Sequence, residues 1–151
     1  MRILYLTQRL PYAPNRGDRL RAWHAIRYLA REHDVTVGAL VHDAEEAGHA
    51  GELSRMTRDV IVGRVPYLAN RVRGAMRLLG ERPLTLSLLD APELSRRLRK
   101  RYATDRPDLV VASCSSMARF AMEPPLADVP LIIDMIDTDS AKWRDYARIA
   151  T

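Results

Sequence analysis

The feature that most constrains the fold is a series of five short, continuous apolar runs, separated by longer stretches with helical periodicity. A continuous apolar run of about four to eight residues is typical of a strand that is buried on both faces of a parallel sheet. The runs are Arg2–Thr7, Val35–Val41, Val60–Val65, Leu109–Cys114 and Leu131–Ile136. Because strands alternate with helices along the chain, the pattern predicts a right-handed, doubly wound α/β domain with helices on both faces of a parallel sheet.

The stretches between these runs have apolar residues at helical spacing, which predicts the crossover helices. Asp90, followed three residues later by Glu93, has the spacing of a capping box and predicts a helix that extends to about Tyr102. The last helical pattern reaches Thr151 without a glycine cap, so we expect the chain to be cut within a helix. The other expected helices are about Arg19–Glu32, Ala44–Arg55, Tyr67–Leu79, a short one from Ser115 or Ser116 to Met122, and a last one from Asp139 or Ser140.

Length and composition indicate one domain over residues 1–151, because 47% of the residues are hydrophobic and can form a full core. Cys114 is the only cysteine, so neither an intrachain disulfide nor a cysteine-rich zinc site is possible. The apolar run near the N-terminus is too short for a signal peptide, and a membrane-spanning helix needs about 20 apolar residues. We therefore expect a cytoplasmic protein.

The charge pattern does not favour nucleic-acid binding. The formal net charge is +5, from 24 Lys and Arg residues against 19 Asp and Glu residues. The basic residues are scattered among acidic ones, and aromatic residues make up only 6% of the chain. Nucleic-acid surfaces concentrate basic residues and interleave them with stacking side chains. We therefore expect no nucleic-acid partner.

Ligands of an open parallel sheet bind outside the carboxyl ends of the strands, near the point where the strand order reverses. This rule selects the loop 8–18, the loop Ser113–Ser116 and the segment Asp134–Ser140. In the first loop, Gly17 precedes a helix whose N-terminus attracts anions, so the backbone there could approach a phosphate closely. The loop is neither G-x-G-x-x-G nor a P-loop, and the alternative is a turn glycine followed by Asp18 as the N-cap.

The other two segments carry hydroxyl and carboxylate groups. Ser113–Ser116 could hold a sugar hydroxyl or an anion, but it lacks the G-x-S-x-G elbow of a hydrolase, and Cys114 is expected to be a small buried residue. Asp137 could accept a substrate hydroxyl or act as a base at the end of the fifth strand, whereas Asp139 could instead cap the next helix. Three acids without a partner motif do not predict a metal site. The histidines show no ligand spacing and are expected to be surface or packing residues: His24, His33, His42 and His49.

Four segments form a distinctive combination. They read R-I-L-Y-L-T-Q-R-L-P-Y-A-P-N-R-G-D-R-L-R-A from Arg2, E-R-P-L-T from Glu81, S-S-M-A-R-F from Ser115 and D-M-I-D-T-D-S-A-K-W from Asp134. Together they resemble the N-terminal half of family-4 glycosyltransferases, and in particular bacterial sugar transferases associated with exopolysaccharide production. The resemblance implies one half of a GT-B fold, in which two Rossmann-like domains face each other across a cleft. It also implies retaining transfer from a nucleotide sugar as co-substrate, without a metal or another cofactor.

In this family the N-terminal domain mostly carries the acceptor site, and its first loop also contacts the donor. The resemblance therefore assigns the donor diphosphate and sugar to Arg16, Gly17 and Asp18, the acceptor to Ser115, Ser116 and Asp139, and a catalytic, orienting role to Asp137. Many relatives have a His in the neighbourhood of Asp137. The C-terminal domain with the nucleotide pocket and the E-x-x-x-x-x-x-x-E motif is absent from this chain, so the chain alone is expected to be inactive.

Alternatives remain open. The chain could be a non-catalytic Rossmann-like module that binds a sugar, a nucleotide or a protein partner, or a generic doubly wound domain that shares only the architecture of transferases. Acceptors in the family are often lipid-linked, and the basic stretch Tyr67–Leu79 could lie on the inner face of an anionic membrane, or could equally be a helix that covers the sheet. An apolar patch where the missing domain would dock could also make the fragment a homodimer.

Overall fold

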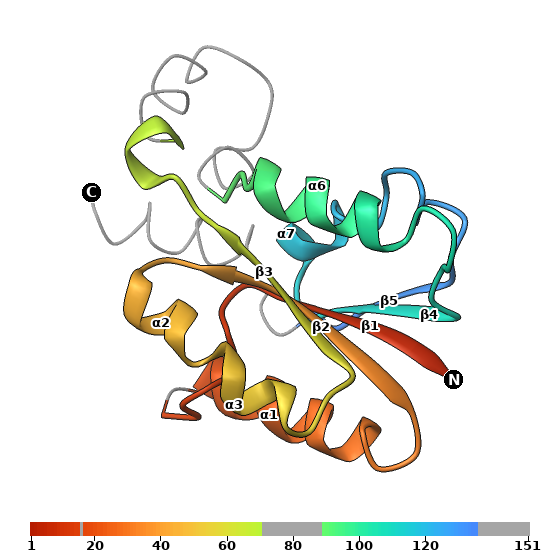
Figure 1. Cartoon of the computed structure of the whole chain (residues 1–151), viewed down its shortest axis with the longest axis horizontal. Coiled ribbons are helices and arrows are strands. Elements are labelled where there is room, and N and C mark those ends of the chain that lie inside the picture. The colour runs from red at the N-terminus through yellow and green to blue at the C-terminus, as the bar shows by residue number, and fades with distance from the viewer. Residues whose placement is uncertain (16, 71–88, 136–151) are drawn as a thin grey trace, which may run out of the picture.

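The structure is a computed structural model that describes residues 1–15, 17–70 and 89–135. In these residues a five-stranded parallel sheet has the order β3-β2-β1-β4-β5 (Figure 1). Its strands are β1 (Arg2–Thr7), β2 (Asp34–Val41), β3 (Asp59–Arg64), β4 (Leu109–Ala112) and β5 (Leu131–Ile133). The chain winds outward from β1 to β3 and then continues on the other side of β1, so the strand order reverses between β1 and β4. This confirms the predicted doubly wound, Rossmann-like α/β fold.

Helices cover both faces of the sheet, as predicted. One face is covered by α6 and α7 and the other by α1, α2 and α3 (Figure 1). Alternation along β1 sends Leu4 and Leu6 to the first face and Ile3 and Tyr5 to the second, so each face has its own apolar core. The helices are α1 (Gly17–Leu29), α2 (Ala44–Gly48), α3 (Ala50–Ser54), α6 (Pro92–Arg101) and α7 (Ser115–Ala118).

All five predicted strands are present, but the last two are shorter than predicted. β4 ends at Ala112 instead of Cys114, because the chain leaves the strand to enter α7. β5 ends at Ile133, and the predicted end at Ile136 lies outside the described residues. Burial of β5 on both faces was also predicted wrongly: Ile132 is 53% exposed and Ile133 42%. The reason is that β5 pairs only with β4 and forms an edge of the sheet.

The predicted caps of α1 and α7 were wrong. α1 begins at Gly17, so Asp18 lies inside the first turn and is not the N-cap. α7 begins at Ser115 with Cys114 as its N-cap, and it ends at Ala118 rather than at Met122. In both places the helix begins earlier along the chain than the predicted cap requires.

The predicted capping box at Asp90 was also wrong. Ala91 is the N-cap of α6 and makes no side-chain cap, and Pro92 occupies the first turn. Glu93 instead accepts a hydrogen bond from the backbone N–H of Arg64 at 3.1 Å and forms an ion pair with Arg97 at 2.6 Å. The carboxylate therefore links α6 to the end of β3.

The predicted helix Ala44–Arg55 is divided at His49 into α2 and α3. Asp43 is the N-cap of α2, and its Oδ1 accepts a hydrogen bond from the backbone N–H of Glu46 at 2.7 Å. This cap fixes the first turn of α2 directly after β2.

A close approach between β3 and α6 requires a glycine. A Cβ placed on Gly63 would lie 2.5 Å from Cβ, 2.8 Å from N and 2.9 Å from Cα of Leu94. Leu94 itself is fully buried in the core between this helix and the sheet. Only a residue without a side chain therefore lets α6 pack at this distance.

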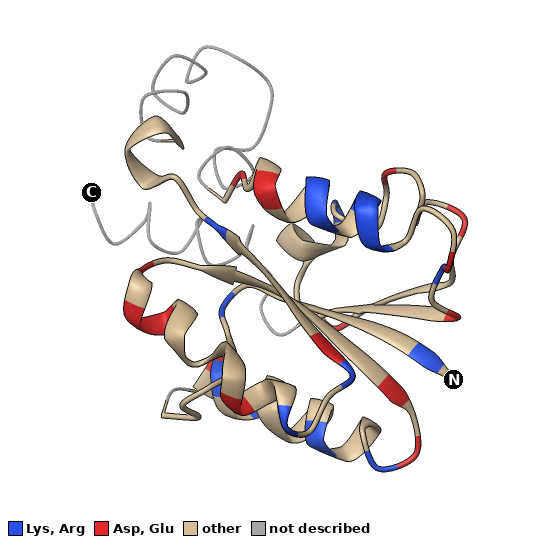
Figure 2. Ribbon diagram, in the orientation of Figure 1, with Lys and Arg blue, Asp and Glu red and all other residues tan. Residues whose placement is uncertain are grey.

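Several expectations lie outside the described residues, namely the last helix from Asp139 or Ser140, the segment at Glu81, and Tyr67–Leu79 beyond residue 70. Residues 67–70 are helical. Within the part of the chain that the structure describes, no helix is long and apolar enough to cross a membrane. Basic and acidic residues are interspersed over both helix layers (Figure 2).

Candidate functional site

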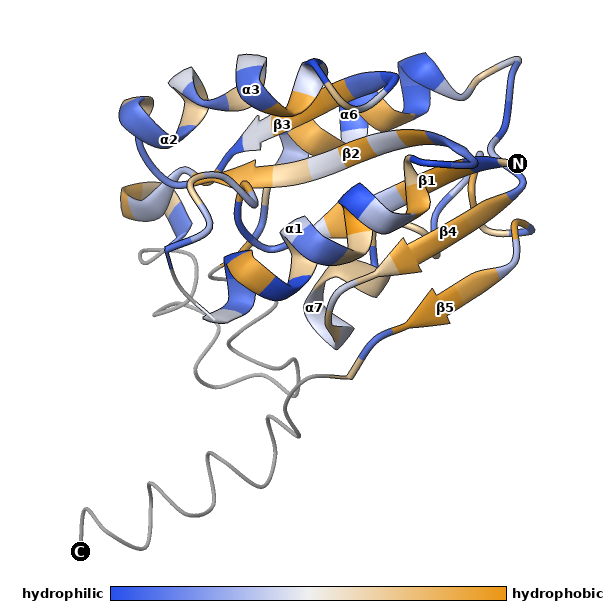
Figure 3. Ribbon diagram, turned by 90° about the horizontal axis from the view of Figure 1, so that it is seen from below, coloured by the Kyte–Doolittle hydropathy of each residue, from blue (hydrophilic) through white to orange (hydrophobic). Residues whose placement is uncertain are grey.

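The carboxyl ends of β1, β4 and β5 lie side by side, because the three strands are neighbours in a parallel sheet. The arrowheads of β4 and β5 point the same way in Figure 3. Two backbone hydrogen bonds hold the outgoing chain segments together. The N–H of Ser113 donates to the carbonyl of Leu6 at 2.9 Å, and the N–H of Asp134 donates to the carbonyl of Ala112 at 2.8 Å. The strand reversal therefore brings together the starts of the three segments that the sequence selected.

At the first of these segments, Gly17 and Asp18 are exposed in the first turn of α1, and Arg16 lies outside the described residues. A Cβ on Gly17 would meet no atom within 4 Å, and its φ is not in the left-handed region. The backbone therefore does not require a glycine here. What the missing side chain provides is open space beside the start of α1, where the first N–H groups of a helix have no intrahelical partner.

The serine segment has one exposed serine. Ser115 is exposed, whereas Ser116 is buried and its Oγ lies 3.0 Å from Sγ of Cys114. Cys114 is only partly buried, although the sequence suggested a buried residue. Of the two serines assigned to the acceptor, Ser115 is thus the accessible one. The remaining assigned residues, Asp137 and Asp139, lie outside the described residues.

Asp134 forms a two-point ion pair that the sequence analysis missed. Nε of Arg21 donates to Oδ2 at 3.1 Å and Nη2 donates to Oδ1 at 2.6 Å, which connects α1 to the end of β5. The pair lies near the buried Tyr5, whose pKa is raised first by burial and then by the negative charge of Asp134. Arg21 and Asp134 are far apart in the sequence, and no local pattern marks them as partners.

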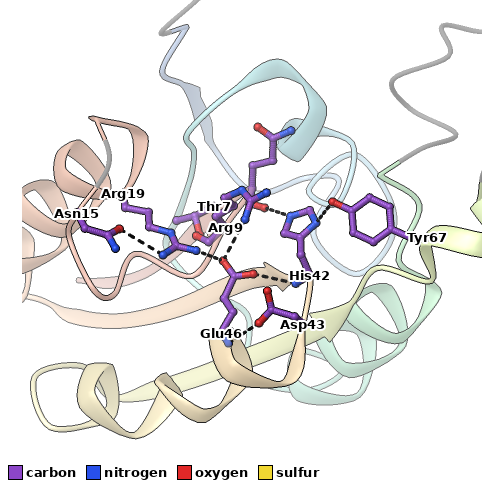
Figure 4. A network of polar contacts seen from close by, with 9 residues as sticks. Thr7, Arg9, Asn15, Arg19, His42, Asp43, Glu46 and Tyr67 are labelled. Atoms are coloured by element: carbon purple, nitrogen blue, oxygen red, sulfur yellow. Dashed lines mark hydrogen bonds and ion pairs between the residues drawn. The ribbon is translucent and has the colours of Figure 1, made fainter.

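A second polar network lies over the carboxyl ends of β1 and β2 (Figure 4). Its centre is Glu46, a buried carboxylate that is only 3% exposed. Oε1 accepts a hydrogen bond from Nη2 of Arg19 at 2.9 Å, and Oε2 accepts one from the backbone N–H of His42 at 2.8 Å. Nη1 of Arg9 lies farther away, at 3.9 Å from Oε1. We call Arg9, Arg19, His42 and Glu46 the Glu46 cluster.

His42 ties this cluster to two other segments. Its Nε2 lies 3.2 Å from the carbonyl of Gln8, and its Nδ1 lies 2.6 Å from the hydroxyl of Tyr67. A carbonyl can only accept, so Nε2 carries the proton and Nδ1 accepts the hydroxyl of Tyr67. Partial burial is the main cause that lowers the pKa of His42, which keeps the ring neutral. The sequence analysis did not predict these two contacts, because Gln8 and Tyr67 are distant from His42 in the sequence.

The carboxyl ends of the strands carry different polar groups on the two sides of β1. Over β1, β4 and β5 lie an exposed serine, the start of α1 and the Arg21–Asp134 pair, whereas over β1 and β2 two guanidinium groups flank one carboxylate. Among the described residues, no group of three or more His, Cys, Asp or Glu side chains is placed to hold a metal ion. No protein-family model matches the chain, and no curated protein matches it either.

Proposed function

We propose that this chain is the acceptor-side, N-terminal domain of a retaining glycosyltransferase. The enzyme would transfer a sugar from a nucleotide sugar to a glycan or lipid-linked acceptor in exopolysaccharide synthesis. The observation that supports this proposal is the reversal of the strand order between β1 and β4. Because of it, the loops that contain Gly17 and Ser115 leave neighbouring strands at one edge, and these are the loops that the family resemblance assigns to donor and acceptor.

In this mechanism the described residues bind and orient. The N–H groups at the start of α1 hold a phosphate oxygen or the sugar of the donor, because the helix end carries a partial positive charge. The hydroxyl of Ser115 contacts the acceptor, and Asp137, outside the described residues, orients the acceptor or the reacting sugar. A second domain binds the nucleotide and closes over this edge, so that transfer takes place with little water present.

The test begins with the protein purified from its native source. Its intact mass is compared with the 17.2 kDa of these residues, and it is then incubated with labelled nucleotide sugars and a lipid extract of the same cells. A mass of about twice that value or more, with transfer of label and retention of configuration, is the expected result. A mass of 17.2 kDa without transfer from any donor would contradict the proposal and favour a binding module.

Gly17→Leu tests the role of the first loop, and Gly51→Leu is the matched control. Both glycines are exposed in the first turn of a helix, and a Cβ at either position meets no atom within 4 Å. We expect Gly17→Leu to raise KM for the donor about tenfold or more, because the side chain fills the space that the phosphate needs. Gly51→Leu should leave KM unchanged. Equal values for the two variants would remove Gly17 from the donor site.

A further inference from the structure

The backbone at Gln8 and Arg9 is held in place from two sides. The hydroxyl of Thr7, a buried residue at the end of β1, donates a hydrogen bond to the carbonyl of Arg9. Nε2 of His42 donates to the carbonyl of Gln8 from the end of β2. Arg9 therefore leaves the sheet from a fixed point at the edge where ligands of such sheets bind.

The guanidinium group of Arg9 has unused hydrogen-bonding capacity. It donates no hydrogen bond to any described residue, and its shortest ion-pair distance, to Glu46, is 3.9 Å. The side chain is 27% exposed, so its donors can be reached from solvent. Glu46 does not need this contact, because Arg19 and the N–H of His42 already occupy its two oxygens.

Arg19 has an unused donor as well. Its side chain is 14% exposed, and its Nε is buried without a hydrogen-bond partner among the described residues. Buried donors are nearly always paired in proteins, so such an atom calls for an explanation. Two guanidinium groups against the one buried carboxylate leave the cluster with one unbalanced positive charge. Asp43, an acid at the start of α2, is exposed to water and uses Oδ1 to cap that helix.

We propose that Arg9, with Arg19 behind it, binds a phosphate group of a small-molecule ligand over the carboxyl ends of β1 and β2. A planar guanidinium group with free donors suits the oxygens of a phosphomonoester or a diphosphate, and the excess positive charge favours these anions over a neutral sugar. Glu46 is a positioning residue, because it holds Arg19 and lies beside Arg9 without touching the ligand. This phosphate site uses the side chains of Arg9 and Arg19, whereas the donor contacts proposed at Gly17 use backbone N–H groups at the start of α1.

The first experiment measures binding of inorganic pyrophosphate to the whole chain by titration calorimetry, with Arg9→Gln and Arg55→Gln compared at the same ionic strength. Arg55 is a suitable control because its side chain is 76% exposed and pairs with Glu52 at 2.8 Å on the surface. Each of the two variants loses one positive charge, so the change in net charge is the same. We expect Arg9→Gln to weaken binding about tenfold or more and Arg55→Gln less than about twofold. No saturable binding to the wild-type chain, or equal losses in the two variants, would overturn the proposal.

A second comparison distinguishes the planar guanidinium group of Arg9 from its positive charge. Arg9→Lys keeps the charge but loses the planar group, and it should recover only part of the affinity that Arg9→Gln loses. Thermal unfolding of each variant shows whether the fold is intact. If Arg9→Gln unfolds at the same temperature as the wild-type chain and binds pyrophosphate with the same affinity, Arg9 is not the phosphate ligand.

Competition against bound pyrophosphate identifies the source of the phosphate. Displacement by uridine diphosphate indicates a nucleotide ligand, displacement by farnesyl phosphate indicates a lipid-linked one, and displacement by neither would overturn a site for organic phosphates. Gly51→Leu, which lies outside both proposed sites, should leave pyrophosphate binding unchanged, and sugar transfer is measured in a separate assay. The phosphate site would therefore stand if Arg9 binds pyrophosphate while the sugar-transfer assay fails, and the two proposals can fail independently.

Discussion

Replacing Gly63 by alanine is expected to destabilise the fold by about 3 kcal/mol, the upper part of the range for overpacked cores. The new Cβ would lie 2.5 Å from Cβ of Leu94 and less than 3 Å from its N and Cα. Carbon atoms in contact are normally about 3.5–4.0 Å apart, so the gap between β3 and α6 would have to open by about 1 Å. The atoms in the way belong to the body of a helix, and no side-chain rotation can remove them.

Two other glycines provide graded controls. A Cβ on Gly38 would lie 2.7 Å from Cδ2 of Leu6, the end of a side chain that can rotate, so Gly38→Ala should cost less, about 1–2 kcal/mol. A Cβ on Gly51 meets nothing, and alanine is favourable in a helix, so Gly51→Ala should be neutral or stabilising by about 0.5 kcal/mol.

Urea denaturation followed by far-ultraviolet circular dichroism measures these differences, and thermal unfolding should place Gly63→Ala about 6–12 °C below the wild-type chain. The order of destabilisation matters more than the absolute values. If Gly63→Ala is within about 0.5 kcal/mol of Gly51→Ala, the close packing of α6 on β3 is not a rigid constraint and the argument fails.

Two further predictions concern the Glu46 cluster. Glu46→Gln should destabilise the fold by about 3 kcal/mol, because it leaves the largely buried Arg19 without its charge partner. The control Glu52→Gln, on the surface, should change the stability by less than about 0.5 kcal/mol. Similar urea midpoints for the two variants would contradict this prediction. Burial lowers the pKa of His42 below its ordinary value of 6.5, so the unfolded chain binds a proton more readily than the folded chain. The contribution of this histidine to stability is therefore present above about pH 6.5 and is lost as the pH falls toward the folded-state pKa. Urea denaturation of the wild-type chain and His42→Asn at several pH values should show their stability difference shrinking as the solution is acidified, and a constant difference would exclude this role.

The position of the candidate site could be predicted in outline from the sequence. The loop before Gly17 and the segment around Ser115 follow predicted strands, and parallel strands end at one edge, so their proximity follows from the strand order. The exposure of their side chains could not be predicted. Ser115 and Ser116 have the same chemistry and adjacent positions, yet one is exposed and the other is buried against Cys114.

The sequence by itself indicated the five strands that the structure describes, their succession along the chain and the fold class, because continuous apolar runs and helical periodicity are local properties of the chain. The tertiary structure alone decided which polar residues meet. Glu45 and Glu46 are identical neighbours, but α2 directs one to solvent and the other under two arginines that come from β1's loop and from α1. Likewise, the apolar run of β5 resembles that of β1, and only the sheet order makes β5 an edge. Partners in space depend on how elements pack, and no local pattern records that packing.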